Sequence, residues 1–243
     1  MKVLLLAAGR GNRLMPITKN IPKCLAPINE VPLIDYWFSL FRKYNIDEIL
    51  INTHYLSENI NNYIKNHVQD LKIKVECETE LLGSLGSILK YLPYFSTEKY
   101  LLTFYSDNLT NLNIKKFITF HESHDLPCTI GLFRCEKPEE CGIATLNDDN
   151  IVIDFIEKPK NSDSNLANAG IYAFDLDIFN QFELNNNKGL LDIAYDLIPQ
   201  LVGQMKAFII NDFILDIGTH ENYKKANDYI TLNPNIFKLE SGK

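Results

Sequence analysis

The sequence has few cysteines, no excess of positive charge and no long apolar run, and each absence excludes a class of protein. Its five cysteines are odd in number and form no CxxC pair, which argues against a disulfide framework and a zinc site. A net charge of −7 argues against general binding to nucleic acids or anionic membranes. We find no signal peptide and no run long enough to span a bilayer. The sequence therefore predicts a cytoplasmic protein with reduced cysteines and without a nucleic-acid or membrane partner.

The length and composition are those of a globular protein. The chain has 243 residues, of which 46% are hydrophobic and 23% charged, so it can bury a sizeable core. No linker rich in Pro, Gly or Ser divides it. We predict a single domain over residues 1–232, made of two halves at about 1–110 and 111–232, and a short tail at 233–243.

Apolar runs alternate with helical patterns through the first half. The predicted strands are 2–7 (KVLLLA), 48–53, 72–78 and 100–105. The predicted helices are 31–44, 57–67 and one that residues 80–87 open and that runs to about Leu92. The continuous apolar run at 2–7 is typical of the centre of a parallel sheet that is covered on both faces. The alternation predicts an α/β fold, a Rossmann-like arrangement of three layers with a mainly parallel central sheet.

The second half is richer in strands, which predicts a small β-rich subdomain. The predicted strands are 129–134, 142–146, 151–157, 168–174, 206–210 and 213–216, and the predicted helices are 178–182, 190–201 and 221–230. Residues 147–150 (NDDN) are a hairpin turn signal, Asn211-Asp212 is a second turn, and 185–189 is a polar loop.

Two glycines follow the first strand, at the edge where open α/β sheets bind ligands. Gly9 and Gly11 let backbone N–H groups approach a phosphate without a Cβ in the way, and the cations of Arg13 and Lys23 can meet the remaining phosphate charge. The pattern is not the dinucleotide fingerprint, because Leu14 stands where a third glycine belongs, and it is not a P-loop. Taken alone, the two glycines fit a structural bend equally well.

Two aspartates each follow an apolar strand and are candidates to hold a divalent cation over bound phosphates. They are Asp107 and Asp216, and magnesium prefers one or two carboxylates together with phosphate oxygens and water. The alternative for each is a turn or a helix cap, although Thr219 fits the N-cap of helix 221–230 better than Asp216 does. Gly218 indicates a close approach of the backbone. The sequence thus predicts a metal–triphosphate site where two acids face the glycine loop.

The stretches LAAGRGNRLMPIT (6–18) and PKCLAP (22–27) are more specific than the glycines alone. They resemble the signature of the sugar-1-phosphate nucleotidyltransferases, or NDP-sugar pyrophosphorylases, which reads roughly LAGGxGTRLxPLT followed by PKxLxP. Ala8 and Asn12 replace the usual Gly and Thr, and neither change removes a charge.

Further motifs of this family follow in order as far as about residue 226. Residues 80–87 (ELLGSLGS) are similar to the E-x-x-LGT-x-G segment, 157–159 to EKP, 168–172 to NAGxY, 142–143 to part of YGV, and 216–218 to D-x-G. Ser106 replaces the Gly of a Gly-Asp motif, and Cys141 stands where the aromatic residue of YGV usually is. Each match is weak by itself, but the ordered set is specific.

The resemblance implies roles for named residues. It implies catalytic Arg13 and Lys23, Mg²⁺ on Asp107 and Asp216, nucleotide binding by Leu6, Ala8, Gly9, Gly11, Asn12, Glu80, Gly83 and Ser84, and sugar-phosphate binding by Asn108, Gly142, Glu157, Lys158, Asn168 and Gly170. In isolation, Lys158 and Glu157 would be an ordinary surface pair, Asn168 the start of a strand and Glu80 an acid at a helix start.

The implied reaction joins an NTP and a sugar 1-phosphate into an NDP-sugar and pyrophosphate, and the resemblance assigns NTP binding to the half at about 1–110 and sugar-phosphate binding to the half at 111–232. Residues 78–84 look most like the mannose-1-phosphate or manno-heptose-1-phosphate guanylyltransferase type, which favours GTP. UTP, dTTP or CTP are alternatives, and so is a cytidylyltransferase for a non-sugar phosphate such as phosphocholine. A catalytically inactive nucleotide-binding subunit is the third reading, against which the retained charged residues argue. The expected partners are the NTP and the sugar 1-phosphate, and a homodimer is left open.

Overall fold

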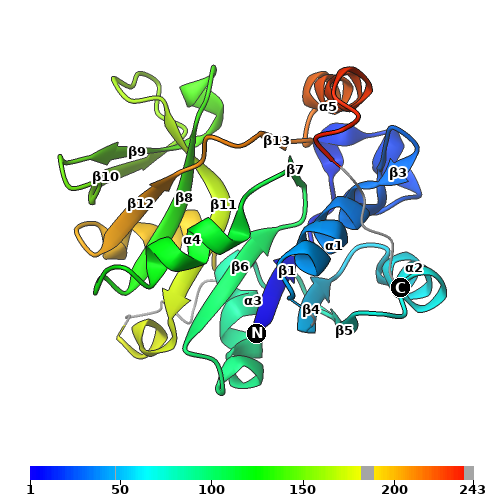
Figure 1. The fold of residues 1–243 in the computed structure, drawn as a ribbon, viewed down its shortest axis with the longest axis horizontal. Coiled ribbons are helices and arrows are strands. Elements are labelled where there is room, and N and C mark those ends of the chain that lie inside the picture. The colour runs from blue at the N-terminus through cyan, green and yellow to red at the C-terminus, as the bar shows by residue number, and fades with distance from the viewer. Residues whose placement is uncertain (47, 182–188, 238–243) are drawn as a thin grey trace. The chain divides into compact units, whose positions relative to one another are not determined.

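The structure, a computed structural model, describes residues 1–46, 48–181 and 189–237 (Figure 1). The chain forms two compact units. Unit 1 comprises Met1–Leu81, Tyr105–Ile114 and Asp212–Lys243, and unit 2 comprises Leu82–Phe104 and Lys115–Asn211. Most of the predicted polar loop at 185–189 and of the tail at 233–243 lies outside the described residues. The units interleave in sequence, so the assignment of one ligand to each half of a single domain stays a prediction.

Unit 1 contains the parallel strands that the alternating pattern predicted. Strand β1 (Lys2–Leu6) pairs in parallel with β4 (Glu48–Thr53), and β4 pairs in parallel with β5 (Lys72–Cys77). The crossovers are α1 (Leu33–Lys43) and α2 (Ser57–His67), and Figure 1 shows α1 against one face of the sheet. Helix α1 begins two residues later than predicted, because β3 (Val31–Pro32) pairs with β2 (Pro27–Ile28).

A further two-stranded sheet completes unit 1. Strand β7 (Asn108–Thr110) pairs antiparallel with β13 (Ile214–Asp216), and Asn108 stands opposite Asp216. Helix α5 (His220–Leu232) follows, and Thr219 caps it by accepting a hydrogen bond from the N–H of Asn222 at 3.2 Å, as predicted. The two strands expected on either side of the Asn211-Asp212 turn do not form a hairpin, because the first of them belongs to unit 2.

Unit 2 is built around the long strand β11 (Leu166–Asp175). It pairs antiparallel with β6 (Tyr100–Tyr105), β8 (Cys128–Arg134) and β9 (Gly142–Leu146), while β12 (Met205–Ile209) runs parallel to β8 and β10 (Val152–Glu157) antiparallel to β9. The predicted turn at 147–150 joins β9 and β10. The side-chain oxygen of Asn147 accepts hydrogen bonds there from the N–H groups of Asp149 and Ile151.

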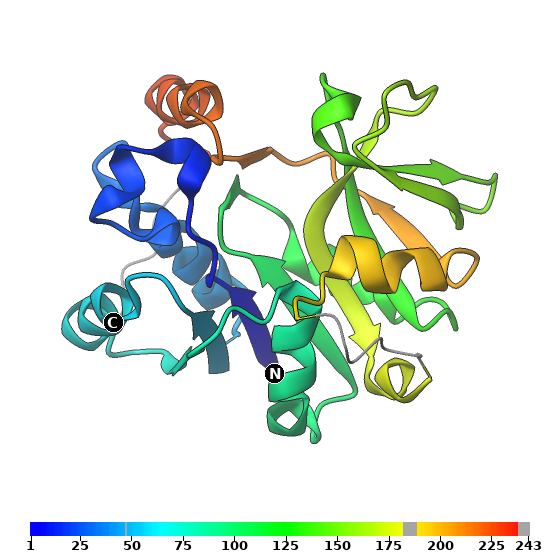
Figure 2. The ribbon, with the colours of Figure 1, turned by 180° about the vertical axis from the view of Figure 1, so that it is seen from behind.

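Helical segments cover both faces of the sheet in unit 2. Helix α4 (Ile114–His121), which the sequence did not predict, lies on the face toward the viewer in Figure 1, and the segment 193–201 covers the opposite face in Figure 2. The predicted helix at 190–201 begins only at Ile193, because the backbone of Leu191 bonds to the start of α3 (Ser84–Tyr91) instead. The predicted helix at 178–182 is the short turn Leu176–Asn180.

The described residues include all five cysteines, and they form no disulfide. Cys24 and Cys128 are buried, and burial raises the pKa of the Cys24 thiol to about 12. Within the same part of the chain, no helix is both long and apolar enough to cross a membrane.

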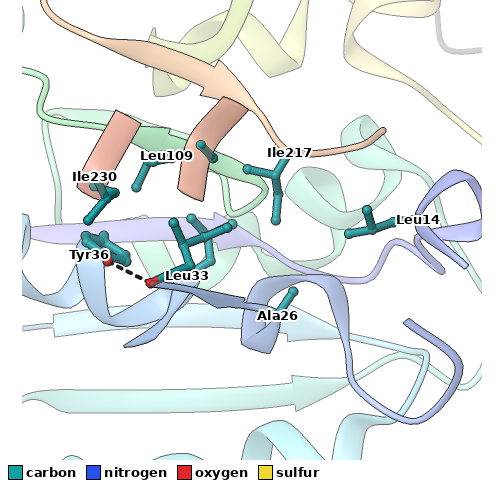
Figure 3. Packing of buried hydrophobic residues seen from close by; sticks show 9 residues of the cluster. Leu14, Ala26, Leu33, Tyr36, Leu109, Ile217 and Ile230 are labelled. Atoms are coloured by element: carbon teal, nitrogen blue, oxygen red, sulfur yellow. Dashed lines mark hydrogen bonds between the residues drawn. The ribbon is translucent and has the colours of Figure 1, made fainter. Parts of the chain in front are cut away.

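An apolar cluster in unit 1 includes the sequence neighbours of two predicted site residues (Figure 3). Its members are Leu14, Ala26, Ile28, Leu33, Tyr36, Leu109, Ile217, Ala226 and Ile230. Leu14 and Ile217 are fully buried, and they directly follow Arg13 and Asp216 in the sequence. The Tyr36 hydroxyl donates to the carbonyl of Ile28 at 2.9 Å, which satisfies its polar end. The packing of this cluster therefore fixes the backbone on which the charged residues stand.

We expect Leu14→Ala to lower the free energy of unfolding by about 2–5 kcal/mol, because it leaves a cavity in a closed core. Chemical denaturation measures the change. Leu232→Ala is the matched control, since Leu232 is 79% exposed, and its change should stay within about 0.5 kcal/mol. Equal stability of the two variants would contradict the placement of Leu14.

Candidate active site

The glycine loop leaves the carboxyl end of β1 in a conformation that needs one of its glycines. Gly11 has φ +65°, and its carbonyl accepts hydrogen bonds from the Thr18 hydroxyl at 2.8 Å and from the N–H of Leu14 at 3.0 Å. No described atom lies within 4 Å of where a Cβ on Gly9 would stand. Leu6 ends β1, and Ala8 is buried beside the loop. The loop is thus held at Gly11 and open at Gly9.

A buried polar chain holds the start of the loop, and the sequence analysis missed it. The N–H of Ala7 donates to both the backbone carbonyl of Asn52, at 3.2 Å, and its side-chain oxygen, at 2.9 Å. The side-chain amide of Asn52 donates in turn to Glu78 at 3.0 Å. Asn52 is 2% exposed and Glu78 is 1% exposed, so this hydrogen-bonded chain lies in the protein interior. The signal available in the sequence was an Asn near the end of the apolar strand EILINT.

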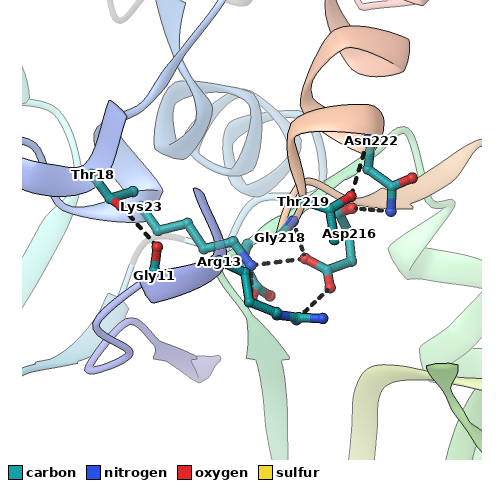
Figure 4. A network of polar contacts seen from close by, with 9 residues as sticks. Gly11, Arg13, Thr18, Lys23, Asp216, Gly218, Thr219 and Asn222 are labelled. Carbon is teal, nitrogen blue, oxygen red and sulfur yellow. Dashed lines mark hydrogen bonds and ion pairs between the residues drawn. The ribbon is translucent and has the colours of Figure 1, made fainter. Parts of the chain in front are cut away.

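Three segments of unit 1 bring four charged residues together (Figure 4). The ammonium Nζ of Lys23 lies 2.6 Å from Oδ2 of Asp107 and 2.8 Å from Oδ1 of Asp216. A guanidinium nitrogen of Arg13 lies 3.7 Å from Oδ2 of Asp216. The structure therefore brings together both residues predicted as catalytic and both predicted as metal ligands.

The cluster is positioned by its surroundings as well as by charge. The N–H of Gly218 donates to Oδ1 of Asp216 at 2.7 Å, and the Asn222 side chain at the start of α5 donates to the Asp216 carbonyl at 2.9 Å. A Cβ on Gly218 would stand 2.8 Å from Nζ of Lys23 and 2.9 Å from a guanidinium nitrogen of Arg13. The close backbone approach that the sequence indicated at Gly218 is confirmed.

The electrostatics of the cluster favour a charged lysine. Burial by itself would lower the pKa of Lys23, but Asp107 and Asp216 outweigh it and raise that pKa above its ordinary value. Burial and the neighbouring charge of Asp107 raise the pKa of Asp216, while Lys23 and the N–H of Gly218 act in the opposite direction. The side chain of Lys23 is 11% exposed, whereas that of Arg13 is 64% exposed and stands open to a ligand.

The two aspartates fit a hard divalent cation that completes its coordination with ligand oxygens. The described residues contain no group of three or more His, Cys, Asp or Glu side chains suited to a metal. Asp107 and Asp216 nevertheless direct carboxylate oxygens at one point, where the Lys23 ammonium now lies. Magnesium typically binds through one or two carboxylates plus phosphate oxygens and water, so the chemistry of this pair fits such an ion.

In unit 2, Gly142, Glu157 and Lys158 lie together at one end of the β9–β10 hairpin. Gly142 stands opposite Glu157, and a Cβ on Gly142 would come 2.4 Å from Oε2 of Glu157. Burial raises the pKa of Glu157, while the neighbouring Lys158 lowers it. Lys158 has φ +51°, an unusual conformation for a side chain of this kind, and its N–H donates to the carbonyl of Cys141 at 2.9 Å.

Asn168 and Gly170 share an irregularity inside β11. The pairing of β11 with β8 shifts register between Asn168 and Tyr172. The Asn168 side chain donates to the Tyr172 hydroxyl at 2.7 Å and accepts from the N–H of Gly170 at 3.0 Å. Asn168 is thus the third residue of β11 and not its first, and its side chain stabilises the irregularity in the pairing of this strand.

The start of α3 is hydrogen-bonded to residues 191–193, at the beginning of the helix predicted at 190–201. Gly83 has φ +81°, and the carbonyl of Leu191 accepts from the N–H groups of Leu85 and Gly86 at 3.0 and 3.2 Å. The Ser84 hydroxyl donates to Asp192 at 2.9 Å and accepts from the N–H of Ile193 at 2.8 Å.

The remaining predicted residues have the following placements. Glu80 is exposed after β5, Asn12 begins a short helical turn, and Asn108 is buried in β7. Asp192 is an additional candidate, because its charge acts on Glu157 and raises the pKa of that carboxyl.

Comparison with known proteins identifies the family. The nucleotidyl transferase family model matches residues 2–233. The chain is 30% identical to D-glycero-alpha-D-manno-heptose 1-phosphate guanylyltransferase of Campylobacter jejuni, over 92% of this chain and 97% of that protein. It is 28% identical to a probable mannose-1-phosphate guanylyltransferase of Oryza sativa, over 95% of this chain but 63% of that protein.

A solved structure gives the same result for the fold. A glucose-1-phosphate thymidylyltransferase from Bacillus anthracis, itself assigned provisionally, matches with a TM-score of 0.84 and 21% identity, over 100% of this chain and 98% of that one. The α/β fold predicted from the alternating strands and helices is thereby confirmed. The resemblance drawn from the glycine loop and the ordered motifs is confirmed as well, and the chain belongs to the nucleotidyl transferase family.

Proposed function

We propose that this protein transfers a nucleotidyl group from GTP to mannose 1-phosphate or a manno-heptose 1-phosphate. The observation that carries the proposal is the convergence of Lys23 and Arg13 on two aspartates beside the glycine loop, in a chain of this family. The preference for a guanine nucleotide and a manno-configured sugar is supported by the names of the two relatives.

In this reaction an oxygen of the sugar 1-phosphate forms a bond to the α-phosphorus of the NTP. The bond from that phosphorus to the bridging oxygen of the departing pyrophosphate breaks. Such transfers need positioning and charge stabilisation more than a nucleophilic side chain. The loop at 9–12 would receive the triphosphate on its N–H groups, Arg13 would stabilise the charge on pyrophosphate, and Lys23 would contact the reacting phosphates.

Asp107 and Asp216 would hold Mg²⁺ together with phosphate oxygens, and the bound ion supplies positive charge that stabilises those oxygens. Glu80, Gly83, Ser84, Leu6 and Ala8 complete the proposed nucleotide site. On the sugar side, Lys158 would bind the phosphate, Glu157 and Asn168 would bind hydroxyls, and Asn108, Gly142 and Gly170 would shape the site. A homodimer and a cytoplasmic location stay predictions from the sequence.

A matrix of NTPs against phosphorylated acceptors tests the substrates, with release of pyrophosphate as the readout. We expect GTP with mannose 1-phosphate or manno-heptose 1-phosphate to give the highest kcat/KM. A higher value with UTP, dTTP or CTP and a sugar 1-phosphate would overturn the nucleotide assignment. Faster release with CTP and phosphocholine would replace the sugar by a non-sugar acceptor. Nucleotide binding without release under every combination would instead indicate an inactive subunit.

Arg13→Gln should lower turnover on the order of 10²–10³-fold while leaving the fold intact, because it removes one charge-stabilising group from an exposed position. Steady-state kinetics and circular dichroism measure the two effects. Arg134→Gln is the control, because Arg134 is also exposed but lies in unit 2 beside Asn165. Near-normal turnover of Arg13→Gln would remove Arg13 from the proposed mechanism.

Gly218→Ala should reduce kcat/KM on the order of 10²-fold, because the added methyl group displaces the ends of Lys23 and Arg13. These ends are flexible, so the free energy of unfolding should change by less than about 1 kcal/mol. Gly189→Ala serves as the control, since no described atom lies within 4 Å of its added Cβ. An active Gly218→Ala enzyme would show that the observed positions of the two cations are not needed for catalysis.

A further inference from the structure

Lys23 occupies the point on which the two candidate metal ligands converge. Its Nζ lies 2.6 Å from Oδ2 of Asp107 and 2.8 Å from Oδ1 of Asp216, both within the range of charge-assisted hydrogen bonds. The main chain at Lys23 is held in place, because the N–H of Ala26 donates to the Lys23 carbonyl at 3.1 Å and the adjacent Cys24 is buried. The ammonium therefore makes the contacts that a divalent cation would make.

The charges of the cluster balance without a metal. Asp107 and Asp216 supply two negative charges, Lys23 supplies one positive charge, and Arg13 supplies another at 3.7 Å from Asp216. A divalent cation that entered beside Lys23 would meet a neutral cluster and a repelling ammonium at close range. A cation that replaced Lys23 would require the lysine to find another negative partner, because an unpaired charge of low exposure is costly.

We propose that Lys23 is an internal competitor of the divalent cation, so that the free protein binds the metal weakly. The cation binds tightly only when a phosphate ligand accepts the Lys23 ammonium. This inference rests on the proposed function, which places phosphates within reach of Lys23. It makes metal binding dependent on substrate, with Lys23 as the residue that couples the two. Gly218 leaves room for the ammonium in its present position.

The test is a titration of the nucleotide-free, full-length protein with Mn²⁺, followed by the electron paramagnetic resonance signal of the free ion. Lys23→Met and Lys23→Gln should bind Mn²⁺ at least about tenfold more tightly than the wild type, because two carboxylates lose their competitor. Lys23→Arg, which keeps a cation, should not show this gain. Lys19→Met is the matched control, since it removes the same charge from an exposed position.

A second readout distinguishes competition from a merely structural role of Lys23. Mn²⁺ should raise the Tm of Lys23→Met but leave that of the wild type nearly unchanged, because the ion takes over the pairing of the two acids. Adding Asp107→Asn to Lys23→Met should abolish both the tighter binding and the rise in Tm. If Lys23 only supported the fold, Lys23→Met would have a lower Tm than the wild type, and that Tm would not depend on metal.

The wild type provides a measurement that does not depend on how the variants fold. The ¹⁵N signal of the Lys23 ammonium should persist when Mg²⁺ is added alone and change when Mg²⁺ and inorganic pyrophosphate are added together. A change with Mg²⁺ alone, or equal Mn²⁺ affinity of wild type and Lys23→Met, would overturn the proposal. None of these measurements uses an NTP or a sugar. A failure of this proposal is therefore distinguishable from a failure of the proposed function, which the substrate matrix tests.

Discussion

The ion pairs of Lys23 with Asp107 and Asp216 are the interaction on which the arrangement of the site depends. They join residues that are 84 and 193 positions apart in the sequence, and the three residues come from the three separate segments of unit 1. Each segment also contributes to one apolar cluster, through Leu14 and Ala26, Leu109, and Ile217. The packing that closes the core thus also determines where the charged residues meet. The arrangement of the site therefore depends on the correct folding of unit 1.

The positions of these charged residues in the fold could be predicted from the sequence because they follow from local patterns. Apolar runs ending in an acid place Asp107 and Asp216 at strand ends, and the glycine loop directly follows the first strand. The antiparallel pairing of β7 with β13, which sets Asn108 opposite Asp216, then brings the second acid back to the first. That pairing is long-range, and the sequence predicted neither strand β7 nor its pairing with β13. The roles of these residues stay predictions even where their positions are now described.

What the sequence did not predict depends on tertiary context. Asn52, Glu78 and Asp192 do not stand out in the sequence from other polar residues. Only the structure shows that Asn52, held by Glu78, accepts from Ala7, and that Asp192 accepts from Ser84. Helix α4 was not predicted, because its eight residues are too few for a helical periodicity to be distinguished from the pattern of a loop. The strands predicted at 206–210 and 213–216 flank a predicted turn, and the sequence did not reveal that the chain passes from unit 2 to unit 1 between them.

The two cations of the site differ in ways that fit different tasks. An ammonium is a compact point charge, and it can stand between two carboxylate oxygens at 2.6 and 2.8 Å, beside a residue with no Cβ. A planar guanidinium would favour one carboxylate in a two-pronged contact and would need the space that Gly218 borders. Arg13, by contrast, is 64% exposed and approaches Asp216 only at 3.7 Å, so most of its donors remain available to an incoming phosphate. Within this cluster the charge of Arg13 is therefore the accessible one, whereas the charge of Lys23 is neutralised by Asp107 and Asp216.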